Sequence, residues 1–177
     1  MDLLPVLAIS GSVGVGKTSV LVEIHDILSQ AKVPHGCVER DALAYSWPEH
    51  GRFNEGMAEL NLSCVAGNFL KAGAKRLLIA GVIESSSDIE VYRRCIPNAR
   101  IQVCRLTADV QLRFDRLRAR EIGAGLEWHL NRTQELDAIL DRADLEDFTV
   151  DNGARPLRQV ALELLHAAGW PPGTIST

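Results

Sequence analysis

The chain lacks the features that mark several large classes of protein. Its 177 residues carry 19 basic and 23 acidic side chains, a net charge of −4, so no excess of positive charge favours nucleic acid or an anionic membrane. The longest apolar run, residues 77–83, is too short to span a bilayer. No basic and apolar leader opens the sequence. We therefore expect a cytoplasmic protein that binds neither nucleic acid nor membrane.

Cysteine and histidine also occur without a recognisable pattern. The five histidines have no metal-ligand spacing, and no C-x-x-C pair occurs among the four cysteines, which are Cys37, Cys64, Cys95 and Cys104. The sequence therefore predicts no zinc site. A chain of this length buries a sizeable core without disulfides, so we expect reduced cysteines. We expect one domain over residues 1–177, as a monomer or a homodimer.

One stretch carries a specific motif. Residues 11–18 fit G-x-x-x-x-G-K-[ST], the phosphate-binding P-loop. The apolar run at residues 6–9 indicates a buried strand before it, and apolar residues at three- and four-residue spacing indicate a helix after it. This is the context that the motif requires. The predicted nucleotide-binding residues of the loop are Gly11, Ser12, Val13, Gly14, Val15, Gly16, Lys17, Thr18 and Ser19.

The chemistry of the motif predicts binding of ATP with Mg²⁺. Its glycines let the backbone approach a phosphate, and its N–H groups form an anion nest at the positive end of a helix. Lys17 can reach the β- and γ-phosphates, and Thr18 can offer its hydroxyl to Mg²⁺. A dinucleotide-binding motif is excluded, because Ser19 stands where that motif needs Gly or Ala.

Strand and helix patterns alternate along the chain, which predicts a three-layer α/β/α fold with a five-stranded parallel sheet. We expect strands at residues 6–9, 36–40, 76–83, 101–106 and 148–150, and helices at about 17–30, 54–72, a short one ending near 94, 108–121, 128–142 and 157–168. Thr107 is the expected cap of the fourth helix. The expected buried side of the second helix is Met57, Leu60, Cys64, Val65 and Phe69.

Together these features resemble the small-molecule P-loop kinases, the group with gluconate kinase, shikimate kinase, adenylylsulfate kinase, chloramphenicol phosphotransferase and zeta-toxin kinases, and bacterial P-loop NTPases of kinase type. The resemblance rests on residues 11–18, on Asp41 after the second strand, on the arginine-rich helix at 113–120 and on the loop at 151–155. It implies a nucleoside or shikimate kinase-like fold with a helical lid at about residues 113–132. It also implies transfer of the γ-phosphate of ATP to a hydroxyl of a small molecule, such as a sugar or an antibiotic.

The resemblance implies roles for several residues. Asp41 would hold and deprotonate the acceptor hydroxyl, with Glu39, on the same strand face, as the alternative. Arg116 and Arg120 would neutralise the transferred phosphoryl group, unless these arginines form a solvated helix face. The base would be contacted by Arg113 or Arg116 and by the loop residues Asn152, Gly153 and Ala154.

The metal and acceptor sites are less well defined by the sequence. Gly81 stands where the Walker B acid is expected, so Thr18 with Glu84, or Asp41 acting through water, is the predicted magnesium set. Trp47 and Trp128 either line the acceptor pocket or pack as local core. The other residues expected at the pocket are Tyr45, His50, Arg52 and His129.

Two further functions remain open at this point. A nucleoside or nucleotide kinase is one, although Arg52 and Lys71 are the only basic residues between positions 41 and 72. A non-catalytic nucleotide-binding regulator is the other, because a clear Walker B acid is missing. GTPases are disfavoured, since the sequence has no Asn-Lys-x-Asp motif.

Overall fold

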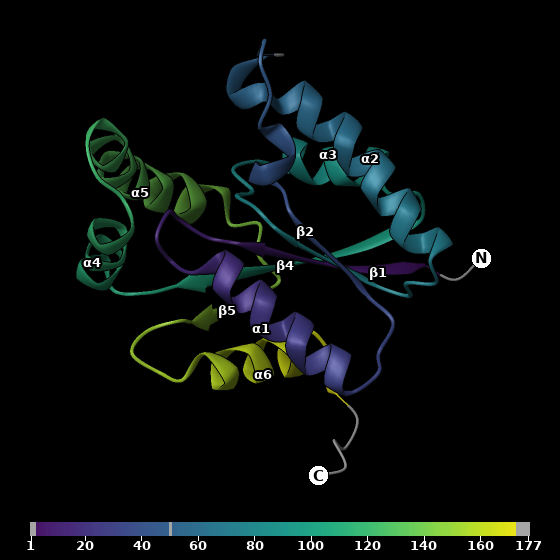
Figure 1. Cartoon of the computed structure of the whole chain (residues 1–177). Helices are drawn as coiled ribbons and strands as arrows, with labels where there is room; N and C mark the ends of the chain where they lie inside the picture. Colours follow the sequence, from purple (N-terminus) through teal and green to yellow (C-terminus); the bar gives the residue numbers. More distant parts are fainter. Residues whose placement is uncertain (1–2, 50, 173–177) are drawn as a thin grey trace.

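Five parallel strands form a single sheet in the order β2-β3-β1-β4-β5. The structure, a computed structural model, describes residues 3–49 and 51–172 (Figure 1). The strands are β1 (Leu4–Ser10), β2 (Gly36–Glu39), β3 (Leu77–Ala80), β4 (Ala99–Thr107) and β5 (Phe148–Asp151). Helices cover both faces, as an all-parallel sheet requires. The predicted three-layer α/β/α fold is therefore confirmed.

The helices divide into two layers and a lateral pair. They are α1 (Lys17–Gln30), α2 (Glu55–Lys71), α3 (Ser86–Cys95), α4 (Val110–Arg120), α5 (Ala124–Ala143) and α6 (Leu157–Ala167). One hydrophobic cluster joins α1 and α6 to the sheet, and a second joins α2 and α3 to the other face. Helices α4 and α5 lie together beyond the sheet, at the end that carries the loop after β1 (Figure 1). No helix of the described ranges is long and apolar enough to cross a membrane.

The central strand β1 sets the register of the sheet. Ile9 is opposite Ala80 of β3 and Cys104 of β4, and Glu39 of β2 is opposite Ala80 as well. Thr107 of β4 is opposite Asp151 of β5. All five carboxyl ends therefore meet at one edge of the sheet, where ligands bind in open parallel folds.

The predicted buried side of α2 is wrong in part: Val65 and Phe69 pack against the second hydrophobic cluster, but other predicted residues do not. The structure buries Ala58, Leu62 and Ala66, whereas Leu60 is 67% exposed and Cys64 is exposed. Apolar residues occur on more than one side of this helix, so their spacing does not identify the face that packs. The inward face of α2 consists of Ala58, Leu62 and Ala66, which recur at four-residue intervals, and the two small alanines let the helix lie close to its neighbours.

Several predicted helix boundaries also change. Asp109, not Thr107, caps α4, because its carboxylate accepts hydrogen bonds from the backbone N–H groups of Gln111 and Leu112. Thr107 instead remains in β4, paired with β5. Helix α5 begins at Ala124 rather than near residue 128, so the glycine-containing break between α4 and α5 is short.

We predict that the face of α6 against α1 is a main source of stability. Leu164→Ala should lower the free energy of unfolding by about 2–5 kcal/mol, because Leu164 is fully buried and its removal leaves a cavity. Leu162→Ala, on the same helix but 37% exposed, should cost about 1 kcal/mol or less. Urea unfolding of both variants checks this, and equal losses would contradict the assigned face.

Candidate nucleotide-binding site

The predicted P-loop forms a tight turn from β1 into α1, and two of its glycines have no substitute. Gly14 and Gly16 have φ values of 80° and 99°, which side chains disfavour. A Cβ on Gly16 would lie 2.5 Å from Nδ2 of Asn152, and one on Gly14 would lie 2.9 Å from the carbonyl oxygen of Arg113. The loop is therefore a backbone cradle that other parts of the chain approach closely, as phosphate binding requires.

Lys17 lies across this cradle. Its Nζ donates to the carbonyl oxygens of Gly11, at 2.8 Å, and Ser12, at 3.2 Å. Burial lowers the pKa of Lys17, the carboxylates of Asp41 and Glu39 act to raise it, and Arg120 acts to lower it. The predicted catalytic residues Lys17, Asp41 and Arg120 are thus close enough to interact electrostatically.

Thr18 makes a contact that the sequence did not specify. Its Oγ1 donates to Oε2 of Glu39 at 2.5 Å. Burial raises the pKa of Glu39 and Asp41 raises it further, while Thr18 and Lys17 lower it. A hydroxyl beside a carboxylate is a ligand pair that suits Mg²⁺.

Glu39 places a carboxylate close to where the Walker B acid is expected. Gly81 follows β3, and a Cβ there would lie 3.0 Å from Cβ of Arg40. The carboxylate comes instead from the neighbouring strand β2, where Glu39 is level with Ala80. Alternation along β2 places Glu39 and Cys37 on the face toward α1 and Val38 on the opposite face. Thr18 and Glu39 together therefore fit a magnesium ion.

The predicted metal residue Glu84 has another partner. Its Oε1 accepts from Nη2 of Arg132 at 2.5 Å. Arg132 is 8% exposed and also pairs with Glu135 of α5. Glu84 therefore ties the segment after β3 to α5, and its role as a magnesium ligand stays a prediction.

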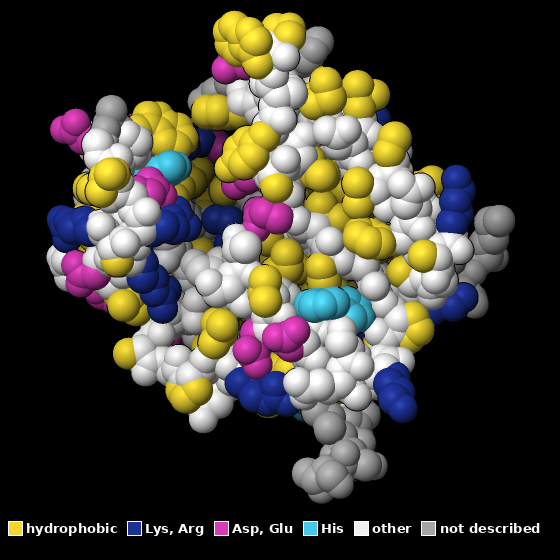
Figure 2. Space-filling model, viewed as in Figure 1, with side chains coloured by type: hydrophobic (Ala, Val, Ile, Leu, Met, Phe, Trp, Pro, Cys, Tyr) yellow, Lys and Arg dark blue, Asp and Glu magenta, His cyan; other side chains and the backbone are white. Residues whose placement is uncertain are grey.

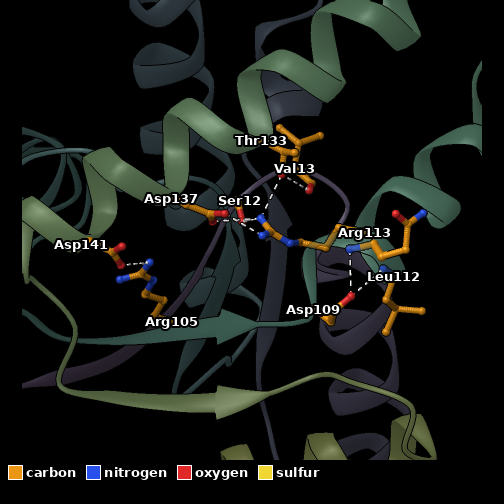
Figure 3. A network of polar contacts seen from close by, with 10 residues as sticks. Ser12, Val13, Arg105, Asp109, Leu112, Arg113, Thr133, Asp137 and Asp141 are labelled. Atoms are coloured by element: carbon orange, nitrogen blue, oxygen red, sulfur yellow. Dashed lines mark hydrogen bonds and ion pairs between the residues drawn. The ribbon is translucent and has the colours of Figure 1, made fainter.

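Arg113 is part of a buried polar network that joins α4, α5 and the P-loop (Figure 3). Its guanidinium forms two parallel bonds with Asp137 of α5, at 2.9 and 2.6 Å, and also donates to the hydroxyls of Ser12 and Thr133. Thr133 in turn donates to the carbonyl oxygen of Val13 at 2.7 Å. With a residue exposure of 5%, Arg113 holds the loop in place, and its predicted contact with the base stays a prediction.

Arg116 and Asn152 join the P-loop to the loop after β5. Arg116 donates to the carbonyl oxygens of Val15, at 3.2 Å, and Asn152, at 3.0 Å. The buried amide of Asn152 donates to the same Val15 oxygen at 2.7 Å. Of the residues predicted to contact the base, Asn152 and Gly153 adjoin Arg116, and Ala154 follows as an exposed residue.

The tip of the predicted lid is held by exposed side chains. Arg120 pairs with Glu121, and Glu121 also accepts a contact from His129. Arg118 pairs with Asp115, and both are exposed, so the solvated-face interpretation holds for that residue. Arg120 has a side-chain exposure of 63%, which leaves it accessible at the mouth of the site.

Aromatic side chains lie exposed where the sequence predicts the acceptor pocket. Tyr45 and Trp47 are 85% and 86% exposed, so Trp47 does not pack as local core. The ring of Phe53, which the sequence analysis did not single out, lies 6.3 Å from that of Trp128. His129 lies beside Trp128. Of the other predicted pocket residues, His50 and the side chain of Arg52 lie outside the described residues.

Comparison with known proteins identifies the class of fold. No family model and no curated protein matches the sequence. Among solved structures, a tunicamycin resistance protein from Deinococcus radiodurans is 20% identical, with a TM-score of 0.62 over 93% of this chain and 95% of that chain. A gluconokinase from Sinorhizobium meliloti 1021 is 17% identical, with a TM-score of 0.58 over 96% and 94%. Shikimate kinase from Acinetobacter baumannii, in complex with shikimate, is 17% identical, with a TM-score of 0.58 over 93% and 92%.

The chain therefore has the fold of the small-molecule P-loop kinases, and the predicted resemblance is confirmed at that level. At these identities the likeness concerns the fold alone. The residues of the site must carry any argument about chemistry.

We predict that Glu39, rather than Glu84, supports the magnesium ion. Glu39→Gln should raise the Mg²⁺ concentration needed for tight ATP binding by at least about tenfold, because it removes the charge beside Thr18. Glu84→Gln should leave that Mg²⁺ concentration unchanged. Calorimetric titration of ATP at several Mg²⁺ concentrations measures both, and the opposite ranking would restore Glu84 as the ligand.

The network in Figure 3 gives a stability prediction. Asp137→Ala should destabilise the protein by about 2–4 kcal/mol, because it leaves the buried guanidinium of Arg113 without its anion. Asp115→Ala is the matched control, since its partner Arg118 is exposed and such pairs contribute about 1 kcal/mol or less. Thermal and urea unfolding compare the two, and equal effects would mean that the network is not a structural anchor.

Proposed function

We propose that this protein is an ATP- and Mg²⁺-dependent phosphotransferase that moves the γ-phosphoryl group to a hydroxyl of a small molecule. The observation that carries the proposal is the convergence of Lys17, the Thr18–Glu39 pair and Asp41 at the carboxyl edge of the sheet. A cationic phosphate ligand, a metal-binding pair and a carboxylate base are the parts that phosphoryl transfer needs.

The nucleotide would be held by the P-loop. Its N–H groups and Lys17 would bind the β- and γ-phosphates, and the contacts of Lys17 with Gly11 and Ser12 would give way to phosphate oxygens. Thr18 and Glu39 would hold Mg²⁺, which would supply positive charge to neutralise the phosphate oxygens. Arg116, beside Asn152 and Gly153, lies where the base-binding loop is expected.

Asp41 would act on the acceptor. It follows β2 directly, begins a short 3-10 turn (Asp41–Ala44) and is exposed toward the site, two residues beyond Glu39. A carboxylate there orients the hydroxyl, whose oxygen attacks the γ-phosphorus while ADP leaves, and it accepts the hydroxyl proton. Glu39 and Asp41 thus divide two tasks, because the first contacts Thr18 and the second remains free for the acceptor.

The lid proposed at residues 113–132 would complete the site. Arg116 and Arg120 supply positive charge to the transferred group, and closure excludes water from it. The contact between Trp128 on α5 and Phe53 on the opposite side joins the lid to the acceptor region. In Figure 2, apolar side chains lie on both sides of the hollow between α5 and the segment before α2.

These surroundings favour an uncharged or weakly polar acceptor over a phosphorylated one. Tyr45, Trp47 and Phe53 offer exposed aromatic surface, whereas Lys71 stands at the far end of α2, about 24 Å along the helix axis from Glu55. Aromatic faces with a few polar groups suit sugars and related compounds. The names of two structural neighbours, a gluconokinase and a shikimate kinase, agree with a small acceptor.

Two substitutions test this function. Lys17→Ala should abolish ATP turnover, and Asp41→Asn should keep ATP binding but lower phosphoryl transfer by about 10²–10⁴-fold. The acceptor is found first by thermal-shift screening of the Mg²⁺–nucleotide complex against sugars, aminoglycosides and nucleosides, since a ligand raises the unfolding temperature by mass action. Product formation is then followed by ³¹P NMR.

The outcomes separate the alternatives. Transfer to a nucleoside alone would identify a nucleoside kinase. Tight ATP binding with no transfer to any compound would identify a non-catalytic regulator, which the carboxylate of Glu39 beside Thr18 disfavours. Full transfer activity in Asp41→Asn would remove Asp41 from the role of base.

A further inference from the structure

Away from the P-loop, the fold brings together three side chains that are typical ligands of transition metals. They are His25 on α1, His35 in the loop before β2, and Cys37 on β2. One ligand atom of each lies within 4.8 Å of the other two. Nδ1 of His25 and Nε2 of His35 are 2.9 Å apart. Figure 2 shows histidine side chains on the face formed by α1.

The same alternation that directs Glu39 toward Thr18 assembles this cluster. Cys37 precedes Glu39 by two residues on β2, so both side chains point to α1. His25 follows Thr18 by seven residues, which is nearly two helical turns, so both lie on the same side of α1. The two elements therefore face each other at two levels, one at the candidate magnesium pair and one at the cluster.

The hydrogen bond of His35 fixes which of its nitrogens is available. Its Nδ1 lies 2.6 Å from the carbonyl oxygen of Val33, which can only accept, so Nδ1 carries the proton. The lone pair of Nε2 then points toward His25. A ring N–H bonded to a backbone carbonyl, with the other nitrogen free to coordinate, is the usual arrangement of metal-binding histidine.

We propose that His25, His35 and the thiolate of Cys37 form a second metal site, for a borderline-soft divalent cation of the Zn²⁺ type. Two imidazoles and one thiolate select such ions over Mg²⁺ and Ca²⁺. A tetrahedral ion with Zn–N bonds of about 2.0–2.1 Å separates its nitrogen ligands by roughly 3.3 Å, so the His25–His35 contact opens only slightly. Three protein ligands leave a fourth position open.

The surroundings fit an ion with an exchangeable fourth ligand. A cavity of about 260 Å³ adjoins the cluster and is lined by the three ligands with Leu21, Val22, Gly36 and Phe69. Coordination by Cys37 would release the proton of its thiol to solvent. In the free protein, Nδ1 of His25 donates its proton to the lone pair of Nε2 of His35. Coordination through Nδ1 of His25 would therefore move that proton to its own Nε2.

The test uses the full chain and Co²⁺ as a spectroscopic probe for Zn²⁺, without nucleotide. We expect one Co²⁺ per chain with a thiolate-to-cobalt charge-transfer band and a tetrahedral d–d spectrum, displaced by Zn²⁺ but not by excess Mg²⁺. Cys37→Ser should lose the charge-transfer band, and His25→Gln should weaken Zn²⁺ binding by more than about tenfold. The controls Cys64→Ser and His166→Gln change exposed residues outside the cluster and should bind as the parent chain does.

Clear results would overturn the proposal. These are an octahedral cobalt spectrum without a thiolate band, or Zn²⁺ affinity equal in the parent chain, His25→Gln and Cys37→Ser. Because His25 is exposed, its substitution keeps the test valid even where Cys37→Ser fails to fold. The site does not depend on phosphotransfer, and binding is measured without ATP, so failure of one proposal leaves the other standing.

Discussion

The candidate site depends on how the carbonyl groups of the P-loop are satisfied. A loop that presents its N–H groups to an anion must direct its carbonyl oxygens elsewhere, and buried carbonyls need donors. Thr133 of α5 donates to Val13, while Arg116 of α4 and Asn152 after β5 both donate to Val15. The ammonium of Lys17 donates to the carbonyls of Gly11 and Ser12. Each donor comes from a separate element, so the sheet, α4 and α5 must all be in place before the cradle has its shape. This explains why glycine is needed at positions 14 and 16, where α4 and the β5 loop come within contact of the backbone.

The same contacts divide the α4–α5 pair into a fixed base and a tip. Arg113 and Asp137 are bonded twice and the arginine is buried, so the base is anchored to the P-loop through Ser12. At the tip, the ion pairs include exposed side chains, as in Arg118 with Asp115 and in Arg120 with the less exposed Glu121. Exposed ion pairs are weak and easily exchanged, whereas a buried pair resists separation. A lid that closes here would therefore move its tip about a base that stays with the phosphates. The aromatic contact between Trp128 and Phe53 lies on the tip side, where such motion would meet the predicted acceptor pocket.

The sequence predicts those parts of the protein that depend on local pattern. The P-loop, the order of strands and helices, and the meeting of the strand ends are set by short motifs and by the rule that parallel strands share an edge. The role proposed for Glu39 is harder to predict from sequence, because it depends on a neighbouring strand: Gly81 has no side chain, and the register of β2 with β3 places Glu39 level with Ala80. The inward face of α2 was only partly predicted, since Ala58, Leu62 and Ala66 are its most buried residues, while the apolar Leu60 lies on the exposed side. The cluster of His25, His35 and Cys37 could not be predicted from the sequence, because its residues come from a helix, a loop and a strand and form no sequence motif.

That cluster and the candidate magnesium pair lie between the same two elements, α1 and β2. Thr18 and Glu39 are 21 positions apart in sequence, and their contact depends on how closely β2 lies against the start of α1. A cation held by His25, His35 and Cys37 would fix that spacing two helical turns further along. If its binding favours the separation that Thr18 and Glu39 need for Mg²⁺, then Mg²⁺ must favour the cation by the same factor, because coupling between two sites is reciprocal. Through one helix and one edge strand, rather than through the lid, a cation at the cluster would therefore change the affinity of Thr18 and Glu39 for Mg²⁺.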